Sequence, residues 1–401
     1  MEGLSAWMEE VSTQMPRLSK PQAAVLAMWS FSLVMTRACS LSGCSLFLAE
    51  LLEAKENTMR QRLREWYWEG TAKKGRSRQS VLVESQFASL LGWVLSKWQG
   101  RQLALAVDAT TLGDQLVVLA VSVVYRGVAI PVAWKVMVGN QPGRWKPEWL
   151  RLLRLIHRAI PAEMMVIVLS DRGISQPWLF KRIRRLGWHP LLRITSNGTF
   201  QPQGQPQYRP LNCLVPSPGT CWQGIGRLYK TKRFPCTLIC RWEAGYEHPW
   251  LLITDLSPGQ ADGCWYGLRA WIEQGFKVTK RAGWQWHRSR ITDPDRAARV
   301  WLVMAVATLW LVGVGGYAEE LAHLATFPPI DVTSPGHLVS KPRQVSVFRR
   351  GWIKLLVALF KHQPLPDYYF LPEPWPDGTV LLDLSLHQAQ LLLTTSENTY
   401  P

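Results

Sequence analysis

Four residues with charged or reactive side chains stand at a regular spacing in the stretch WYGLRAWIEQGFKVTK. They are Tyr266, Arg269, Glu273 and Lys280. At about 100° per residue, a continuous α-helix would place all four within roughly a 60° arc. A phenol, two cations and a carboxylate would then form one polar stripe beside an apolar arc of Trp265, Leu268, Ile272 and Phe276. Such a stripe suits a metal-bound phosphate, and the alternative is an ordinary charged helix face.

Two carboxylates upstream favour the phosphate site. Asp108 ends the alternating segment LALAVD, whose period of two predicts a strand with Ala104 and Ala106 on the same face as the carboxylate. Asp171 follows MMVIVLS, a short apolar run typical of a buried central strand. An aspartate after a strand is usually a turn or a helix cap. Two such sites and a glutamate on a later helix indicate a shared function.

The three carboxylates have the chemistry of a metal site for phosphoryl transfer. Two metal ions about 3.5–4 Å apart activate the attacking oxygen and stabilise the leaving oxygen. Mg²⁺ prefers oxygen ligands and keeps several of its waters, so a few carboxylates are enough. We therefore expect Asp108, Asp171 and Glu273 to be brought together by a sheet and a helix packed on it.

The chain resembles the DDE transposases of bacterial insertion sequences, and within them the insertion-sequence-four group, which has a Tyr-Arg-Glu-Lys helix. The resemblance extends over VDATTLGD, VYRGVAIPVAW, LSDRG, YGLRAWIEQGFK and ITDPDRAARVWLVMAVATLWL, roughly residues 100–318. One departure is Gln274, where an acidic residue is frequent in such helices.

The resemblance implies roles for individual residues. Asp108, Asp171 and Glu273 match the catalytic triad that binds two Mg²⁺ or Mn²⁺ ions. Tyr266, Arg269 and Lys280 match residues that engage phosphate and the terminal nucleotides of the element. It also implies double-stranded DNA as partner, both the terminal inverted repeats and the target, and a homodimer in the DNA complex.

Composition agrees with a polyanionic partner. The net charge is +17 and the pI is about 9.8, so the field of the protein would attract DNA in a salt-dependent way. The chain has 22 tryptophans, most of which we expect in the core, although aromatic faces among cations also suit unstacked bases.

The remaining composition indicates a reduced, cytoplasmic protein. The seven cysteines are irregularly spaced, and we expect buried thiols and no zinc at Cys213, Cys221, Cys236 and Cys240. MEGLSAWMEEVSTQM lacks the pattern of a signal peptide. The apolar run Val300–Ala318 is nearly long enough to span a bilayer, but it follows a Thr-Asp-Pro helix start and is expected to be a core helix. No membrane partner is predicted.

Residues 1–100 predict a helical DNA-binding domain. Four helices are expected, in PQAAVLAMWSFSLVM, CSLFLAELLE, NTMRQRLREWYWEG and QSVLVESQFASLLGWVLSKW. The third carries Arg60, Arg62 and Arg64, and the loop after it adds Lys73 and Lys74. A basic helix and loop suit a helix-turn-helix-like reader of the element ends, with Arg62, Arg64, Lys73 and Lys74 as DNA contacts. The alternative is a solvated basic face on a packing domain.

Residues 101–318 predict an α/β catalytic domain. Strands are expected at 103–107, 116–125, 128–137, 164–169 and 189–195, with helices at 147–160 and 176–186. This order is that of a ribonuclease H-like fold with a mixed sheet. Residues 197–258 are expected to form a β-rich insertion, and Asp262 to cap the helix of Glu273. Residues 319–401 are expected to dock on the core, contact DNA or dimerise.

The sequence and its resemblance therefore predict metal-dependent DNA transposition, by cut and paste with a hairpin intermediate. Two alternatives stay open: a ribonuclease H-like nuclease without strand transfer, and an element-derived protein that binds DNA without catalysis. If a hairpin forms, one of Trp222, Trp242 and Trp250 in the insertion is a candidate to hold an unstacked base, with core packing as the alternative.

Overall fold

The structure is a computed structural model that describes residues 2–73, 79–139, 145–231, 233–326 and 343–376. The chain divides into two compact units. Of the described residues, the first unit comprises those within 2–166, 270–326 and 345–372, and the second those within 167–269, 343–344 and 373–376. The domain boundaries expected from sequence, at residues 100 and 318, stay predictions. The long helix α9 (Pro294–Thr326) continues through residue 318.

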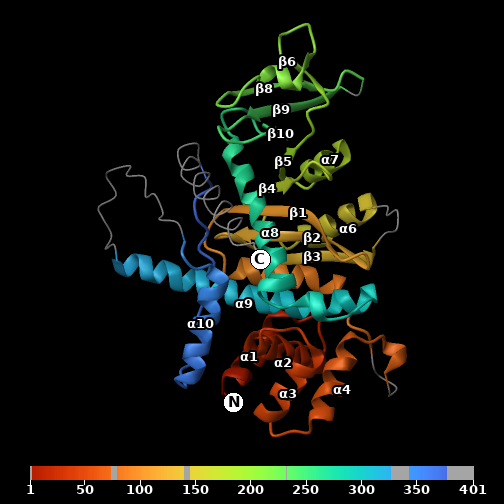
Figure 1. Cartoon of the computed structure of the whole chain (residues 1–401), viewed down its shortest axis with the longest axis vertical. Coiled ribbons are helices and arrows are strands. Elements are labelled where there is room, and N and C mark those ends of the chain that lie inside the picture. The colour runs from red at the N-terminus through yellow and green to blue at the C-terminus, as the bar shows by residue number, and fades with distance from the viewer. Residues whose placement is uncertain (1, 74–78, 140–144, 232, 327–342, 377–401) are drawn as a thin grey trace, which may run out of the picture. The chain divides into compact units, whose positions relative to one another are not determined.

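The N-terminal part of the first unit is helical (Figure 1). Its helices are α1 (Glu2–Gln14), α2 (Lys20–Thr36), α3 (Leu41–Leu51), α4 (Glu56–Tyr67) and α5 (Phe87–Ser96). The expectation of four helices was wrong by one, because α1 was not predicted. This helix buries Leu4, Trp7 and Val11, and Trp7 stacks on Trp310 of α9 with ring centroids 3.9 Å apart.

Three antiparallel strands form the sheet of the first unit: β1 (Gln102–Leu112), β2 (Leu116–Tyr125) and β3 (Val128–Val138). Helix α6 (Trp145–His157) follows, and then β4 (Met165–Ser170) begins, where the Met165 amide donates to the Arg101 carbonyl at 2.8 Å. Every residue of β2 is buried. The positions of these elements agree with the sequence prediction within a few residues, except that β1 runs on to Leu112.

In the second unit β4 continues and pairs in parallel with β5 (His189–Arg193), after helix α7 (Pro177–Arg185). The β-rich insertion extends this sheet with antiparallel partners. These are β10 (Trp250–Thr254), β9 (Phe234–Arg241), β8 (Cys221–Leu228), β6 (Thr199–Pro202) and β7 (Arg209–Pro210).

The strand order is β3-β2-β1-β4-β5, followed by the insertion. An antiparallel trio followed by a parallel strand with helical connections is the arrangement of a ribonuclease H-like core. The predicted α/β fold class with a mixed sheet is therefore confirmed.

The segment with the Tyr-Arg-Glu-Lys spacing is helical but is not one continuous α-helix. It begins as a 3₁₀ helix, η4 (Gly263–Ala270), becomes α8 (Trp271–Lys277) and ends as a π-helix, η5 (Val278–Ala282). The expected continuous α-helix is therefore wrong, and the common arc of the four side chains stays a prediction, because 3₁₀ and π turns rotate by other angles per residue than an α-helix. As expected, Asp262 caps the start, accepting from the Cys264 amide at 2.8 Å.

Helix α8 packs on β1, β2 and β3 within the first unit. The closest approach is at Gly275, where an added Cβ would lie 2.8 Å from the carbonyl oxygen of Ala129 on β3. Glycine therefore allows α8, which carries Glu273, to lie directly on the sheet. Ile272 and Phe276 are buried in this contact face, while Trp265, expected on the same apolar arc, is only half-buried.

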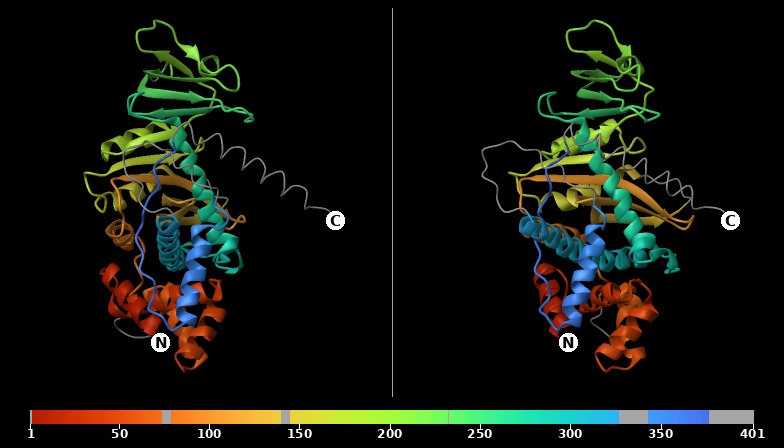
Figure 2. Two further views of the ribbon diagram at one scale, coloured as in Figure 1. Left: turned by 90° about the vertical axis from the view of Figure 1, so that its left-hand side faces the viewer. Right: turned by 60° about the vertical axis from the view of Figure 1, so that its left-hand side comes forward.

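Helix α9 is the central core helix of the first unit. Asp293 accepts from the Arg296 amide at 2.8 Å at its start. Residues Pro294–His323 are long and apolar enough to cross a membrane, but 94% of their apolar window is buried inside the protein. Helix α10 (Val347–Phe360) crosses α9 at Gly315 and Gly351, where an added Cβ would overlap a backbone carbonyl of the other helix (Figure 2).

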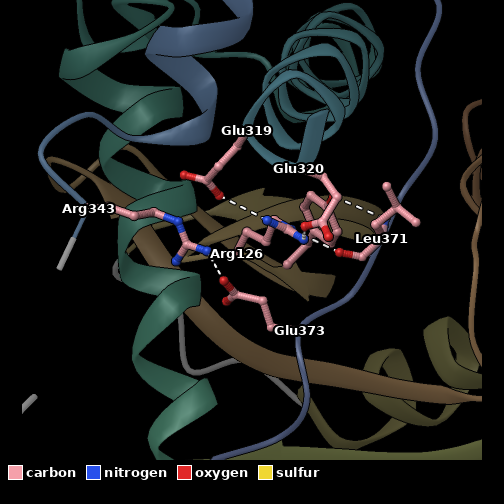
Figure 3. A network of polar contacts seen from close by, with 7 residues as sticks. Arg126, Glu319, Glu320, Arg343, Leu371 and Glu373 are labelled. Atoms are coloured by element: carbon pink, nitrogen blue, oxygen red, sulfur yellow. Dashed lines mark hydrogen bonds and ion pairs between the residues drawn. The ribbon is translucent and has the colours of Figure 1, made fainter. Parts of the chain in front are cut away.

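A C-terminal stretch holds the first unit together. The Arg126 guanidinium donates to the Leu371 carbonyl at 2.8 Å, to Glu319 at 3.0 Å and to Glu320 at 2.5 Å (Figure 3). Arg126 stands in the β2–β3 turn at φ 44°, a left-handed conformation. Within the second unit, Arg343 pairs with Glu373.

Candidate active site and DNA-contacting surfaces

Asp171 lies at the end of β4, in the second unit. Its backbone carbonyl accepts from the amides of Ile174 at 3.1 Å and Ser175 at 3.2 Å, so the chain turns tightly after the carboxylate. The side-chain Oδ1 is buried without a hydrogen-bond partner among the described residues. An acceptor oxygen that is buried and not hydrogen-bonded is costly, and it is the type of atom that a metal ion or a donor from a ligand would satisfy.

Two residues of the Tyr-Arg-Glu-Lys set reach this end of β4. Arg269 Nη2 lies 3.7 Å from Asp171 Oδ2, and only 15% of the Arg269 side chain is exposed. The buried Tyr266 hydroxyl donates to the Ser170 carbonyl at 3.3 Å. Tyr266 also meets the ring of Trp250 edge-on, with centroids 5.3 Å apart. The 3₁₀ segment is thus fixed to β4 by its phenol and its guanidinium.

Asp108 and Glu273 belong to the first unit. Asp108 lies on β1 opposite Ala120 of β2, and its Oδ1 accepts from the Ala109 amide at 2.8 Å. Ala104 and Ala106, which precede it at a period of two, are buried, as expected for a strand with small residues on that face. Glu273 is exposed in the first turn of α8, the helix that lies on β1–β3.

Lys280 lies in the π-helical turn η5. Desolvation, and then the nearby positive charge of Arg281, lower the pKa of its ammonium group. Burial of a cation that is not compensated by a carboxylate is unfavourable, so an anionic ligand here would gain more than at a fully solvated lysine.

The three carboxylates offer hard oxygen donors, which fit a divalent ion such as Mg²⁺. The buried Oδ1 of Asp171 supports this fit. No group of three or more His, Cys, Asp or Glu side chains within the described residues is itself arranged to hold a metal ion. Of the zinc candidates, Cys213 and Cys221 are exposed and Cys236 and Cys240 are buried. The candidate metal-binding role of Asp108, Asp171 and Glu273 therefore rests on the local environment of each side chain.

The N-terminal helices present a second candidate surface, on α4. Met59, Leu63 and Trp66 are buried, while the other residues from Glu56 to Arg62 are exposed. The turn before it, after α3, has Glu53 in a left-handed conformation at φ 49°. Short helix-turn-helix connections of this kind place the beginning of the second helix in the DNA major groove.

The predicted DNA contacts of this region differ in their surroundings. Arg62 is exposed, whereas the Arg64 guanidinium lies over the Trp68 ring, 4.6 Å from its centroid. The Lys73 ammonium donates to the Gln79 carbonyl at 2.8 Å. Lys74 lies outside the described residues. Arg62 is therefore the most accessible of the described candidates.

Sequence reasoning did not single out two exposed amides of α4. Asn57 and Gln61 are four residues apart and, with Thr58, Arg62 and Glu65, line a shallow hollow of about 390 Å³. Gln61 Nε2 donates to Glu65 Oε1 at 3.1 Å. The sequence did offer one indication of them, because two amide side chains four residues apart lie on the same face of a helix.

Tryptophans serve both the core and the insertion. Nine of them are almost completely buried, including Trp7, Trp134, Trp301 and Trp310, so the expected core role is confirmed for these. In the insertion, Trp222, Trp242 and Trp250 are half-buried. Trp222 lines a cavity of about 540 Å³ together with Arg241, Asp262 and Trp265.

Comparison with known proteins gives a domain assignment. Residues 147–310 match the model of the transposase DDE domain. This range contains Asp171, Tyr266, Arg269, Glu273 and Lys280, begins after Asp108, and spans less than half of the chain. The match indicates a DDE transposase, an enzyme that cuts and joins DNA, and domains of this kind use divalent metal ions.

A solved structure is also similar, a piggyBac transposase synaptic complex with hairpin DNA. The identity is 9%, the TM-score is 0.41, and the similarity covers 90% of this chain and 79% of that chain. The chain has no match among curated protein sequences.

Proposed function

We propose that the protein is a transposase of the insertion-sequence-four group, which cuts DNA at the ends of an insertion sequence and joins those ends to target DNA. The observation that carries this proposal is the contact of Arg269 and Tyr266 with the Asp171 end of β4, inside the range that matches the DDE domain. A nuclease without strand transfer would have no need of these two side chains beside the carboxylate.

Asp108, Asp171 and Glu273 would hold two divalent ions, Mg²⁺ or Mn²⁺. Such a pair of ions, when bound, favours attack of an oxygen on the phosphodiester and departure of the other oxygen. The chain's own residues supply the rest. The Arg269 guanidinium, now paired with Asp171, is placed to bind a phosphate oxygen by charge-assisted hydrogen bonds. The half-buried Lys280 ammonium adds a second positive charge.

At the element ends, α4 is the proposed reader. The exposed Arg62 suits a phosphate contact, which positions the protein without reading sequence. The amides of Asn57 and Gln61 suit base edges in the major groove, where Asn and Gln pair with adenine. We further propose that two copies of the chain act together in the DNA complex, and that they do so in the bacterial cytoplasm.

We also propose that cutting passes through a DNA hairpin. A hairpin at the element end requires a base to leave the stack, which costs a few kcal/mol. Stacking on an aromatic face, at about 1–3 kcal/mol, offsets much of that cost. Trp250 is the preferred platform of the three tryptophans, because it is half-buried and contacts Tyr266, which in turn contacts β4 beside Asp171.

The triad is tested by isosteric changes. Asp108→Asn, Asp171→Asn and Glu273→Gln each remove a ligand charge while keeping side-chain shape, so each should abolish nicking and strand transfer but spare binding of the element ends. Gln274→Glu, which alters charge on the neighbouring position, should keep activity. Normal rates of nicking for any triad variant would remove that residue from the site. If the wild-type chain binds the element ends but shows no metal-dependent nicking, the binding-only alternative is favoured. If it nicks DNA without strand transfer, the nuclease alternative is favoured.

The reader helix is tested by comparing Arg62→Ala with Gln61→Ala. Loss of one phosphate contact should lower the slope of log K against log salt by about 0.9 for every duplex. Loss of a base contact should reduce discrimination between element-end and random duplexes by about 1–3 kcal/mol with little change in slope. Fluorescence anisotropy over a range of salt concentrations measures both. Unchanged slope for Arg62→Ala together with unchanged discrimination for Gln61→Ala would show that α4 is not the reader.

The base platform is tested by single alanine substitutions at Trp250, Trp242 and Trp222, with first-strand nicking and second-strand cutting measured separately. Trp250→Ala should slow second-strand cutting by at least tenfold and leave nicking almost unchanged, because the base leaves the stack only in the second step. Equal loss in both steps for all three variants, or no loss in any, would contradict a hairpin held by one of these rings.

A further inference from the structure

Helix α7 carries a group of cations that the proposed active site does not use. Its exposed residues include Lys181, Arg184 and Arg185, and Arg182 is half-buried beside them. At about 100° per residue, Lys181, Arg184 and Arg185 lie within roughly a 100° arc of the helix. The opposite side buries Leu179, Phe180 and Ile183. The helix thus has an apolar face toward the unit and a basic face away from it.

The positive charge of this face is only partly neutralised. Arg184 Nε lies 3.3 Å from Asp255 Oδ2, and the same carboxylate meets His189 Nδ1 at 3.1 Å. Lys181 and Arg185 form no ion pair with any residue that the structure describes. Basic residues in a last turn also stabilise a helix through its dipole, but that effect accounts for one or two cations and not for a helix with four and no carboxylate.

Arg182, the fourth cation of α7, is not part of the exposed surface. The Arg182 Nε is buried and has no hydrogen-bond acceptor among the described residues. A buried N–H of a guanidinium without an acceptor is unfavourable. The guanidinium of Arg185 is exposed instead, and the geometry of a guanidinium matches phosphate oxygens through two parallel N–H groups.

Helix α7 is linked to Asp171 by a short, hydrogen-bonded turn. It begins at Pro177, six residues after the carboxylate, and the Asp171 carbonyl accepts from both Ile174 and Ser175. Ser175 Oγ also donates to that carbonyl at 2.9 Å and lies 2.7 Å from Ser170 Oγ. All these residues belong to the second unit, so the basic face has a defined place relative to Asp171.

We infer that the exposed face of α7, formed by Lys181, Arg184 and Arg185, binds the phosphate backbone of target DNA during strand transfer. This inference rests on the proposed function. The chemistry favours target DNA over element ends because the face offers charged phosphate contacts and no Asn or Gln on the helix. Phosphate contacts carry no sequence information, which suits a DNA of arbitrary sequence.

The test uses the full-length protein with K181Q/R185Q, which removes two charges spaced four residues apart. The matched control is R154Q/R158Q, which removes two exposed cations at the same spacing on and just after α6. Two readouts are needed. The first is binding of a random-sequence duplex across salt concentrations, which requires no catalysis. The second is strand transfer from pre-cut ends as a function of target concentration.

For K181Q/R185Q we expect the salt slope for the random duplex to fall by about 0.9 per charge removed. The target concentration that gives half-maximal strand transfer should rise roughly tenfold, while the maximal rate, end binding and nicking stay near wild type. The control should change none of these. Unaltered melting temperature establishes that the variants are folded.

Other outcomes overturn the inference. An unchanged slope and target dependence would show that the face is only solvated. A parallel loss of end binding or nicking would assign it to element DNA, and an equal loss in the control would show a general effect of net charge. If the wild-type protein lacks cleavage and strand transfer altogether, the proposed function fails, while the duplex-binding comparison still decides whether α7 binds DNA.

Discussion

The ion pair between Arg269 and Asp171 links two segments that are far apart in the sequence, the end of β4 and the 3₁₀ segment before α8. The Tyr266–Ser170 hydrogen bond supports it from the same segment. An aspartate at the end of a central strand can be kept for capping or for ligand binding. Here one oxygen faces a guanidinium and the other is buried without a donor in the part of the chain that the structure describes, which indicates a ligand-binding role. The pair can also exchange partners: when a metal cation and a phosphate bind together, Asp171 can bind the cation and Arg269 the phosphate.

The packing of α8 on the sheet of the first unit explains how the exposed Glu273 is held at a defined place in that unit. Gly275 lets α8 lie on β3, and the central helix α9 packs against β3 from the same unit. Helix α10 crosses α9 at paired glycines, and Arg126 fixes the Leu371 segment to the β2–β3 turn. The Arg299 guanidinium, buried on α9, donates to the carbonyls of Tyr67 at 2.7 Å and Val81 at 3.1 Å. The end of α4 is thereby joined to the core helix, so a DNA reader on α4 would be coupled to the catalytic sheet.

Sequence patterns predicted the strands well because burial of alternate or continuous apolar residues determines them, as in β1, β2 and β4. They failed where backbone geometry departs from a regular period. The stretch from Gly263 to Ala282 changes from 3₁₀ to α to π, which no spacing rule based on 100° reveals. Helix α1 was missed although Leu4, Trp7 and Val11 stand at helical spacing, and these residues are its buried face, with Trp7 stacked on Trp310. The accessibility of Arg62 compared with Arg64 and Lys73 depends on neighbours such as Trp68 and Gln79, which only the structure shows.

The central claim is that Asp108, Asp171 and Glu273 together bind the divalent ions. Iron(II) substituted for Mg²⁺ generates hydroxyl radicals that cut the polypeptide beside the metal, so mapping the cuts in the full-length protein locates the site directly. The account predicts cuts adjacent to residues 108, 171 and 273, all suppressed by excess Mg²⁺ and lost together in Asp171→Asn. Cuts confined to other parts of the chain, or cuts beside only one of the three residues, would contradict it.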